Sequence, residues 1–408
     1  MDSKLQIENY TNYFTKIWEE CREFTPGWKT IYPREVKKAR EKSFEKFIEA
    51  LNKRSNKKEL NSKPAEKLTP VARSLFKTVF DYRDEQLDII LSEGYKKMTK
   101  DFIRMSRQFD PGLTLEDMFQ ACRNAWIMNG MQIMMGHLVE LTPSIFAYSM
   151  LYPYTDNYLD DPGITAEGKI GFNKRFRKRL EGVDVPGKNE NETAIFRLVG
   201  MIENQYNRMQ FPKVYQGLLA IHDAQSRSLC LLGGKYKLTE KDILNICIEK
   251  GGASVLADGY LVAGDLTGEQ ALFFFGFGAY LQLVDDLQDV AEDSCAGQMT
   301  VFSKTAGQQP LDDFAVRLFG FGNRIFETMN HFPGDKVPVF RSLMKKSVET
   351  MLIETILLNG QYYSRPFLET IENQSPLSIA YLKKRRSKLS PNRISFIKKI
   401  VESAMAEL

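Results

Sequence analysis

The sequence predicts an all-α protein, and three observations carry that prediction. Candidate N-caps precede a proline, or stand three residues before Asp or Gln, at Thr69-Pro70, Thr114…Asp117, Thr142-Pro143, Thr239…Asp242 and Thr267…Gln270. Apolar residues then recur at three- and four-residue spacing, most clearly over 238–262 and 271–290. Asn-Gly or Asp-Gly turns between alternating strands are missing. From typical helix lengths we expect roughly ten to fourteen helices.

Composition predicts one large helical bundle preceded by an extension. The chain has 408 residues, 43% of them hydrophobic, which allows a sizeable core. The polar segment 52–67 indicates a boundary, so we assign residues 1–65 to an N-terminal helical extension packed on the bundle. Residues 66–408 form the bundle, with a polar connection at 183–192 and a basic C-terminal tail. The LKKRR run at 382–386 best fits a solvated helix face, with a lid or a membrane-surface patch as the other interpretations.

Charge, cysteine usage and hydropathy exclude several classes of protein. The net charge of +4 is too mild for a nucleic-acid binder. The five cysteines give an odd count without CxxC spacing, as expected of reduced thiols in a cytoplasmic protein. The N-terminal residues carry charges where a signal peptide needs an apolar core, and no apolar run reaches the ~20 residues of a membrane span. We expect a monomer or homodimer, with at most a peripheral membrane contact.

Two acidic clusters lie in long stretches without a basic residue. Neither 124–168 nor 251–303 contains a Lys or Arg, although the chain has 56 of them. In the first stretch, YTDNYLDDPG (154–163) places Asp156 and Asp160 four residues apart on one helical face, with Asp161 adjacent. The Pro-Gly pair that follows should end this helix.

The second cluster, LQLVDDLQDVAED (281–293), repeats this pattern at greater length. Asp285, Asp289 and Asp293 fall at i, i+4 and i+8 on one face, Asp286 lies at the flank, and Glu292 points elsewhere. Carboxylates at the C-terminal end of a helix meet a negative dipole, and like charges four apart repel by a few tenths of a kcal/mol per pair. A cation must therefore come from outside.

The identity of that cation follows from the ligand type. Carboxylate oxygens without Cys or His favour a hard cation, Mg²⁺ or Mn²⁺. Ordinary exposed acids would be interleaved with lysines, which these are not. A calcium loop starting at Asp156 lacks a ligand at its third position and glycine at its sixth, so we reject it.

The paired clusters resemble the aspartate-rich motifs of class I isoprenoid synthases. GAYLQLVDDLQDVAED is similar to the second motif of prenyl-diphosphate synthases, and more loosely to that of squalene/phytoene synthases. DNYLDD stands where the first motif should be, although it departs from plain DDxxD, and the RRG of chain-elongating synthases is absent after it. FQACRNAWIMNG (119–130), IHDAQSRS (221–228) and KGGASVLADGYLV (250–262) look like the bacterial large-terpene synthase family (class IB, tetraprenyl-curcumene synthase-like). The likeness covers about residues 70–300.

The resemblance implies a helical bundle of the isoprenoid synthase type that ionises a prenyl diphosphate with Mg²⁺. Three Mg²⁺ ions are expected, with Mn²⁺ as a substitute, since the departing diphosphate needs its charge neutralised. Asp156, Asp160, Asp285 and Asp289 would be the catalytic carboxylates. The metal ligands would be those four together with Asp161, Asp286 and Asp293.

Further candidates would bind the diphosphate or line a dry pocket. The diphosphate-binding candidates are Arg175, Arg227, Lys250 and Lys304. The pocket candidates are Trp126, Tyr152, Tyr158, Ser254, Phe275 and Gln282, since aromatic faces stabilise a cation and exclusion of water protects it. For each one singly, a surface or core-packing role is the alternative. The two glycines of KGGAS indicate either a break in the helix or close helix packing.

The leading functional expectation is a class I terpene synthase that converts a linear prenyl diphosphate, C15 to C25 or longer, to a linear or cyclic hydrocarbon with release of pyrophosphate. A prenyltransferase, chain-elongating or head-to-head, is the first alternative. The second comes from another class of protein, a non-catalytic helical protein that binds cations or partners through its acidic patches.

Overall fold

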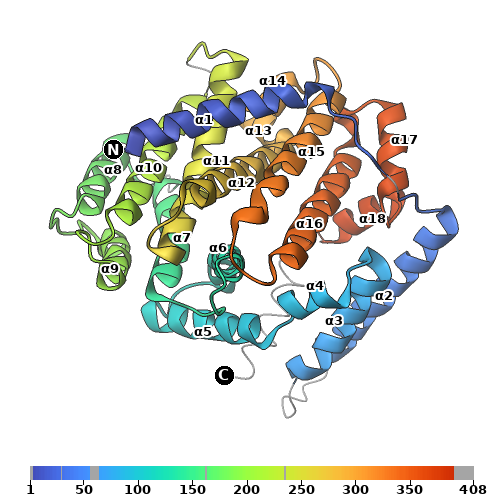
Figure 1. Ribbon diagram of the computed structural model, residues 1–408, viewed down its shortest axis with the longest axis horizontal. Helices are drawn as coiled ribbons and strands as arrows, with labels where there is room; N and C mark the ends of the chain where they lie inside the picture. The colour runs from blue at the N-terminus through green and yellow to red at the C-terminus, as the bar shows by residue number, and fades with distance from the viewer. Residues whose placement is uncertain (1–2, 29, 56–63, 161–162, 234–235, 390–408) are drawn as a thin grey trace. The chain divides into compact units, whose positions relative to one another are not determined.

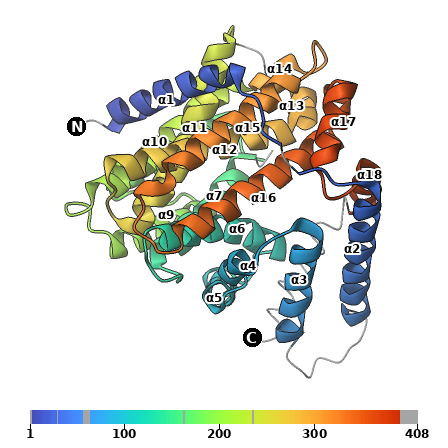
Figure 2. The same cartoon turned by 45° about the vertical axis from the view of Figure 1, so that its right-hand side comes forward.

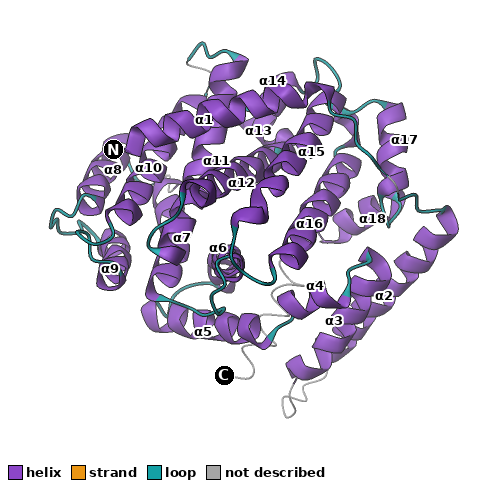
Figure 3. Cartoon of the chain, in the orientation of Figure 1, coloured by secondary structure: helices purple, strands orange, loops and turns teal. Residues whose placement is uncertain are grey.

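The computed structural model is helical throughout the part of the chain that it describes, which confirms the predicted all-α class (Figure 3). It describes residues 3–28, 30–55, 64–160, 163–233 and 236–389. Within these ranges the only strand-like pairing is a single bridge between Leu232 and Gln298. The described residues form more helices than the ten to fourteen expected, because several of the helices are only one or two turns long.

The chain divides into two compact units. The first comprises Met1–Arg22, Gln120–Lys304 and Phe321–Val337, and the second comprises Glu23–Phe119, Thr305–Gly320 and Pro338–Leu408. The helices of the first unit are α1 (Ser3–Glu20), most of α6 (Leu115–Met134), α7 (Pro143–Asp160), α8 (Ala166–Leu180), α9 (Glu190–Gln205), α10 (Pro212–Ser228), α11 (Glu240–Ala263), α12 (Gly268–Gln288), α13 (Val290–Ala296) and α14 (Val301–Thr305). Every residue predicted for the site falls within this unit.

The second unit has a core of its own. Its helices are α2 (Arg34–Ser55), α3 (Pro64–Phe80), α4 (Asp84–Ile90), α5 (Glu93–Phe109), most of α15 (Asp312–Glu327), α16 (Val337–Leu358), α17 (Arg365–Gln374) and α18 (Ile379–Leu389). The Trp28 ring meets Phe319 edge-on at 5.8 Å, and Ile103 packs with Met118. No described helix of either unit is both long and apolar enough to cross a membrane.

Helix α1 belongs to the first unit, whereas α2 belongs to the second, so the expected extension 1–65 is shared between them. Figures 1 and 2 show α1 lying along α10, α11 and α12. Aromatic residues four apart form its apolar stripe. Phe14 stacks on Phe275 of α12 at 6.0 Å, and Trp18 is only 1% exposed. Burial of this stripe makes α1 part of the unit that carries the acidic cluster.

The pair α11 and α12 forms the centre of the first unit. Helix α11 is continuous from Glu240 to Ala263, so Gly251 and Gly252 do not break it. A Cβ atom on Gly251 would lie 2.4 Å from the Gly278 carbonyl oxygen, and one on Gly278 would lie 2.1 Å from the Gly251 carbonyl oxygen. Close packing is therefore the correct interpretation of KGGAS. It aligns Cys247 and Lys250 of α11 with Asp286 of α12.

Most of the predicted helix starts are confirmed. Thr239 with Asp242 and Thr267 with Gln270 form reciprocal capping boxes, as does the pair Thr114 and Asp117. The Thr142 hydroxyl accepts from the Ile145 backbone N–H at 3.3 Å and caps α7. The start predicted at Thr69-Pro70 is wrong, because α3 begins at Pro64 and contains Pro70. Pro64 takes the first helical position, where a missing N–H costs nothing.

Candidate metal and diphosphate site

The second acidic motif spans the joint between α12 and α13. Helix α12 ends at Gln288, and Asp289 caps it with a φ of −94° and a ψ of 10°. The Asp289 N–H still donates to the Asp285 carbonyl at 2.9 Å, and the Asp293 N–H donates to the Asp289 carbonyl at 2.8 Å. These i to i−4 bonds carry the helical register across the joint, so Asp285, Asp289 and Asp293 keep one face, as predicted.

Ionisation of these three carboxylates is unfavourable, because the pKa of each is raised above its ordinary value. Burial, together with the charges of Asp285 and Glu292, raises the pKa of Asp289 to about 6. Burial and the charges of Asp289 and Asp285 likewise raise the pKa of Asp293 to about 6. Among the residues that the structure describes, none forms an ion pair with any of the three. A cation bound here would relieve both the repulsion and the desolvation.

Asp286 lies apart from that face and is 4% exposed. The Gln282 side-chain amide donates to its Oδ1 at 2.8 Å, and the Cys247 thiol lies against it. Burial, opposed by these two contacts and by Lys250, raises the pKa of Asp286 to about 7. Its Oδ2 is buried without a hydrogen-bond partner among the described residues. Such an orphaned acceptor fits a site that takes up a cation or a proton.

Two basic side chains approach the acidic motif. Burial raises the pKa of Asp285, while Lys250 and Arg123 oppose that rise, and Lys250 acts in the same way on Asp293. The structure thus brings the predicted Lys250 to the cluster. Arg123, exposed on α6, was missed by the sequence analysis. The signal was available, because Arg123 is the last basic residue before the stretch 124–168 and lies within FQACRNAWIMNG.

The other two candidates that bracket the acidic segments have partners elsewhere. Arg227 forms an ion pair with Glu249 at 2.5 Å, and its side chain is half exposed. The Lys304 ammonium donates to the Leu238 carbonyl at 3.1 Å, just before α11. A diphosphate would have to compete with these contacts, so neither residue offers a cation as open as Lys250.

The first acidic motif is described through its backbone. Helix α7 is described as far as Asp160, and the proline expected to end it lies outside the described residues. The Asp161 residue and the side chains of Tyr152, Asp156 and Asp160 lie outside the described part of the structure. The motif's aromatic residue, Tyr158, is buried, and its ring lies 4.6 Å from that of Phe172.

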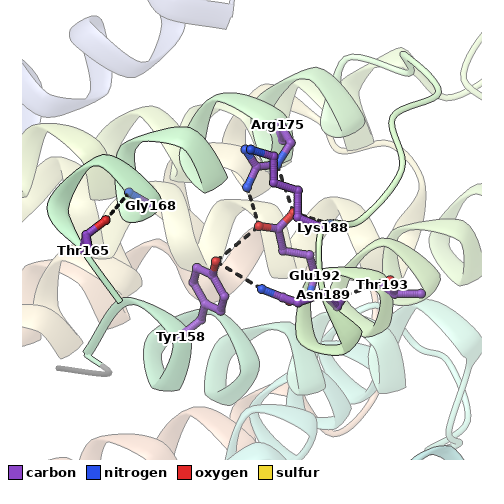
Figure 4. A network of polar contacts seen from close by, with 8 residues as sticks. All are labelled: Tyr158, Thr165, Gly168, Arg175, Lys188, Asn189, Glu192 and Thr193. Atoms are coloured by element: carbon purple, nitrogen blue, oxygen red, sulfur yellow. Dashed lines mark hydrogen bonds and ion pairs between the residues drawn. The ribbon is translucent and has the colours of Figure 1, made fainter. Parts of the chain in front are cut away.

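Tyr158 and the fourth cation candidate, Arg175, meet at a third residue (Figure 4). The Tyr158 hydroxyl donates to Oε1 of Glu192 at 3.2 Å. The Arg175 guanidinium donates through Nε to Oε2 of Glu192 at 3.0 Å and through Nη2 to Oε1. Glu192 is completely buried at the start of α9 and was not selected from the sequence. The structure therefore gives both predicted residues a carboxylate partner outside the two acidic motifs.

The remaining pocket candidates have separate surroundings. Phe275 is fully buried against Phe14 and Tyr10 of α1, which makes it part of the core between helices. The Ser254 hydroxyl faces the Tyr148 phenol. The Gln282 side-chain amide donates its hydrogen bond to Asp286. Trp126 is partly buried on α6.

A buried acid on α11, Asp258, was also missed. It is 1% exposed and accepts a hydrogen bond from the Asn124 side-chain amide at 3.1 Å. Burial, only partly opposed by this bond, raises its pKa to about 8. Lys250, Ser254 and Asp258 are four residues apart along one face of α11. Asp258 could have been identified from the sequence, because it is an acidic residue inside an otherwise apolar helical run.

Within the described part of the chain, no three His, Cys, Asp or Glu side chains come close enough to hold a metal ion on their own. The donors present are nevertheless those of a hard-cation site: three carboxylates that form no ion pair with a described residue, and one buried carboxylate oxygen without a hydrogen-bond partner among the described residues.

Neither a protein-family model nor a curated protein sequence matches this chain.

Proposed function

We propose that the chain is a Mg²⁺-dependent class I terpene synthase, which ionises a linear prenyl diphosphate of C15 to C25 or longer. One observation carries the proposal. Asp285, Asp289 and Asp293 share a helical face and form no ion pair with a described residue. The charge of Asp285 raises the pKa of the other two, and Lys250 is close enough to oppose the rise at Asp285 and Asp293. Carboxylates whose ionisation is unfavourable, next to a basic side chain that forms no ion pair with a described residue, suit a metal–diphosphate complex.

The residues that would hold Mg²⁺ are Asp285, Asp289 and Asp293, with Asp286 beside them and the acids of DNYLDD as the second set. Bound Mg²⁺ would supply the positive charge that neutralises the departing diphosphate. Proteins commonly bind this ion through one or two carboxylates, with phosphate oxygens and water completing the shell. The substrate would therefore contribute ligands that the chain alone lacks.

Within this proposal, Lys250 and Arg123 donate hydrogen bonds to the diphosphate oxygens. The allylic C–O bond breaks, its electron pair stays on the diphosphate, and an allylic carbocation remains. The attraction between the Lys250 ammonium and the diphosphate grows as negative charge accumulates on the leaving group. Lys250 therefore stabilises the transition state more than the ground state. Transfer of a proton from a carbon beside the cationic centre to the released pyrophosphate then yields an alkene, linear or cyclic.

The apolar stem of α12 would help to keep water from the cation. Residues 273–280 are all buried, and they lead directly to Asp285. Exclusion of water prevents capture of the cation as an alcohol.

The test is incubation of the purified protein with C15, C20, C25 and C35 prenyl diphosphates and Mg²⁺, without isopentenyl diphosphate. We expect a hydrocarbon and one equivalent of pyrophosphate for at least one chain length. Turnover only after isopentenyl diphosphate or a second prenyl diphosphate is added would assign the chain to the prenyltransferases. A protein that releases no pyrophosphate under any of these conditions would fit the non-catalytic alternative.

A further inference from the structure

We infer that Glu192 is a positioning residue, which holds the C-terminal turn of α7 in place through its hydrogen bond with Tyr158 on the side opposite the acidic face. Arg175 then stabilises Glu192 and does not bind diphosphate. The inference rests on the proposed function, because it assigns the metal-binding role to the face of α7 that carries positions 156 and 160. Figure 4 shows the residues involved.

The Glu192 carboxylate is saturated by donors from separate segments. It accepts from the Tyr158 hydroxyl on α7, from two nitrogens of Arg175 on α8, and from the Lys188 backbone N–H at 3.0 Å in the loop before α9. Its own backbone N–H donates to the Asn189 side chain at 2.8 Å, which caps α9. A carboxylate with no exposed surface is stable only when its lone pairs are paired in this way.

Glu192 is therefore held as an anion at a fixed place. Burial alone would raise its pKa, but the Arg175 guanidinium, the Lys188 N–H and the Tyr158 hydroxyl outweigh burial and lower it. Arg175 supplies two parallel N–H donors, the geometry that gives a guanidinium–carboxylate pair both direction and strength. The pair is a rigid support, since α8 and the start of α9 are tied through it.

The Glu192 carboxylate contacts α7 at Tyr158, which lies two residues from Asp156 and two residues from Asp160. Successive helical residues are about 100° apart, so positions 156 and 160 lie about 160° around α7 from Tyr158, one on either side. The last turn of α7 is weakly held, because its terminal carbonyls have no partners inside the helix. The Glu192–Tyr158 hydrogen bond attaches this turn to α9 on the side opposite positions 156 and 160. Without this hydrogen bond, the last turn of α7 can fray or rotate.

The same geometry reassigns Arg175. Its guanidinium meets Glu192 on the Tyr158 side of α7, which is the side away from positions 156 and 160. Its side chain is 19% exposed, and two of its three nitrogens are committed to Glu192. A diphosphate held at the acidic face would thus lie across α7 from this cation.

Tyr158→Phe is the sharpest test, because it removes one hydroxyl and keeps the ring on Phe172. We expect the Mg²⁺ concentration for half-maximal pyrophosphate release to rise about tenfold, with kcat at saturating Mg²⁺ within about threefold of the wild type. Mn²⁺ binding in the presence of pyrophosphate, measured by electron paramagnetic resonance, should weaken to the same extent. Tyr206→Phe is the matched control, since it removes another buried tyrosine bond, 2.9 Å to the Leu261 carbonyl, and should change neither value.

Arg175→Lys tests the reassignment of Arg175. An anchoring role predicts the shift in Mg²⁺ dependence seen with Tyr158→Phe, and an unchanged inhibition constant for pyrophosphate at saturating Mg²⁺. A diphosphate-binding role predicts an unchanged Mg²⁺ dependence and weaker inhibition by pyrophosphate, and that result would overturn the inference. An unchanged metal dependence in Tyr158→Phe would overturn it as well, while leaving the proposed function intact. A wild-type protein that neither turns over nor binds Mn²⁺ with pyrophosphate would overturn both.

Discussion

Replacing Asp258 with Asn should stabilise the protein, and the gain should grow with pH. The carboxyl is 1% exposed, its pKa lies at about 8, and that of an Asp in an unfolded chain is about 3.9. Because the folded-state pKa is the higher one, the carboxyl adds no penalty below about pH 4, and stability is lost progressively as pH rises towards 8. Each unit in this window costs about 1.4 kcal/mol. The penalty is therefore about 2 kcal/mol at pH 5.5, about 4 at pH 7 and about 5 at pH 8.

Asparagine keeps the acceptor that Asn124 uses and never ionises, so Asp258→Asn removes this penalty. Thermal unfolding of the wild type and the variant from pH 5.5 to pH 8 measures it. A unit of 150–250 residues gains about 2–4 °C per kcal/mol, so the variant should unfold about 8–16 °C higher at pH 7. Asp184→Asn, in the exposed loop after α8, is the control and should show no such gap. A gap that stays constant across the pH range would refute the reasoning.

Four other substitutions test the packing, the capping and the motifs. Gly251→Ala places a Cβ 2.4 Å from the Gly278 carbonyl and should destabilise the first unit by about 1–3 kcal/mol, seen as a lower Tm, whereas Gly268→Ala meets no neighbour and should not. Thr239→Ala removes the α11 cap and should cost about 1 kcal/mol in chemical denaturation, and no loss would show the cap to be silent. Asp156→Asn and Asp289→Asn should each reduce pyrophosphate release at least about a hundredfold, about 2.7 kcal/mol in the barrier. Asp184→Asn, in the exposed loop after α8, is the control. Unaltered turnover in Asp156→Asn or Asp289→Asn would contradict the metal assignment.

Features that depend on neighbouring residues could be predicted from the sequence. Capping at Thr142, Thr239 and Thr267 needs only a hydroxyl and the next backbone N–H groups, so local sequence decides it. The shared face of Asp285, Asp289 and Asp293 follows from the helical repeat and survives the change of backbone at Asp289, since the i to i−4 bonds continue. The Thr69-Pro70 start failed because Pro64 offers a competing local signal a few residues earlier.

Features that depend on how helices pack could not be predicted in this way. The sequence determined that this chain is all-α and that its acids at 285, 289 and 293 share a face without lysine or arginine nearby in the chain. Only the tertiary structure decided that Lys250 lies near these acids while Arg227 pairs with Glu249, because both contacts join residues of different helices. It also decided that Glu192, which falls in the segment 183–192 expected to be a polar connection, lies in α9 and is fully buried between Tyr158 and Arg175. Burial and long-range pairing are set by contacts between segments far apart in the chain, and a local pattern carries no information about them.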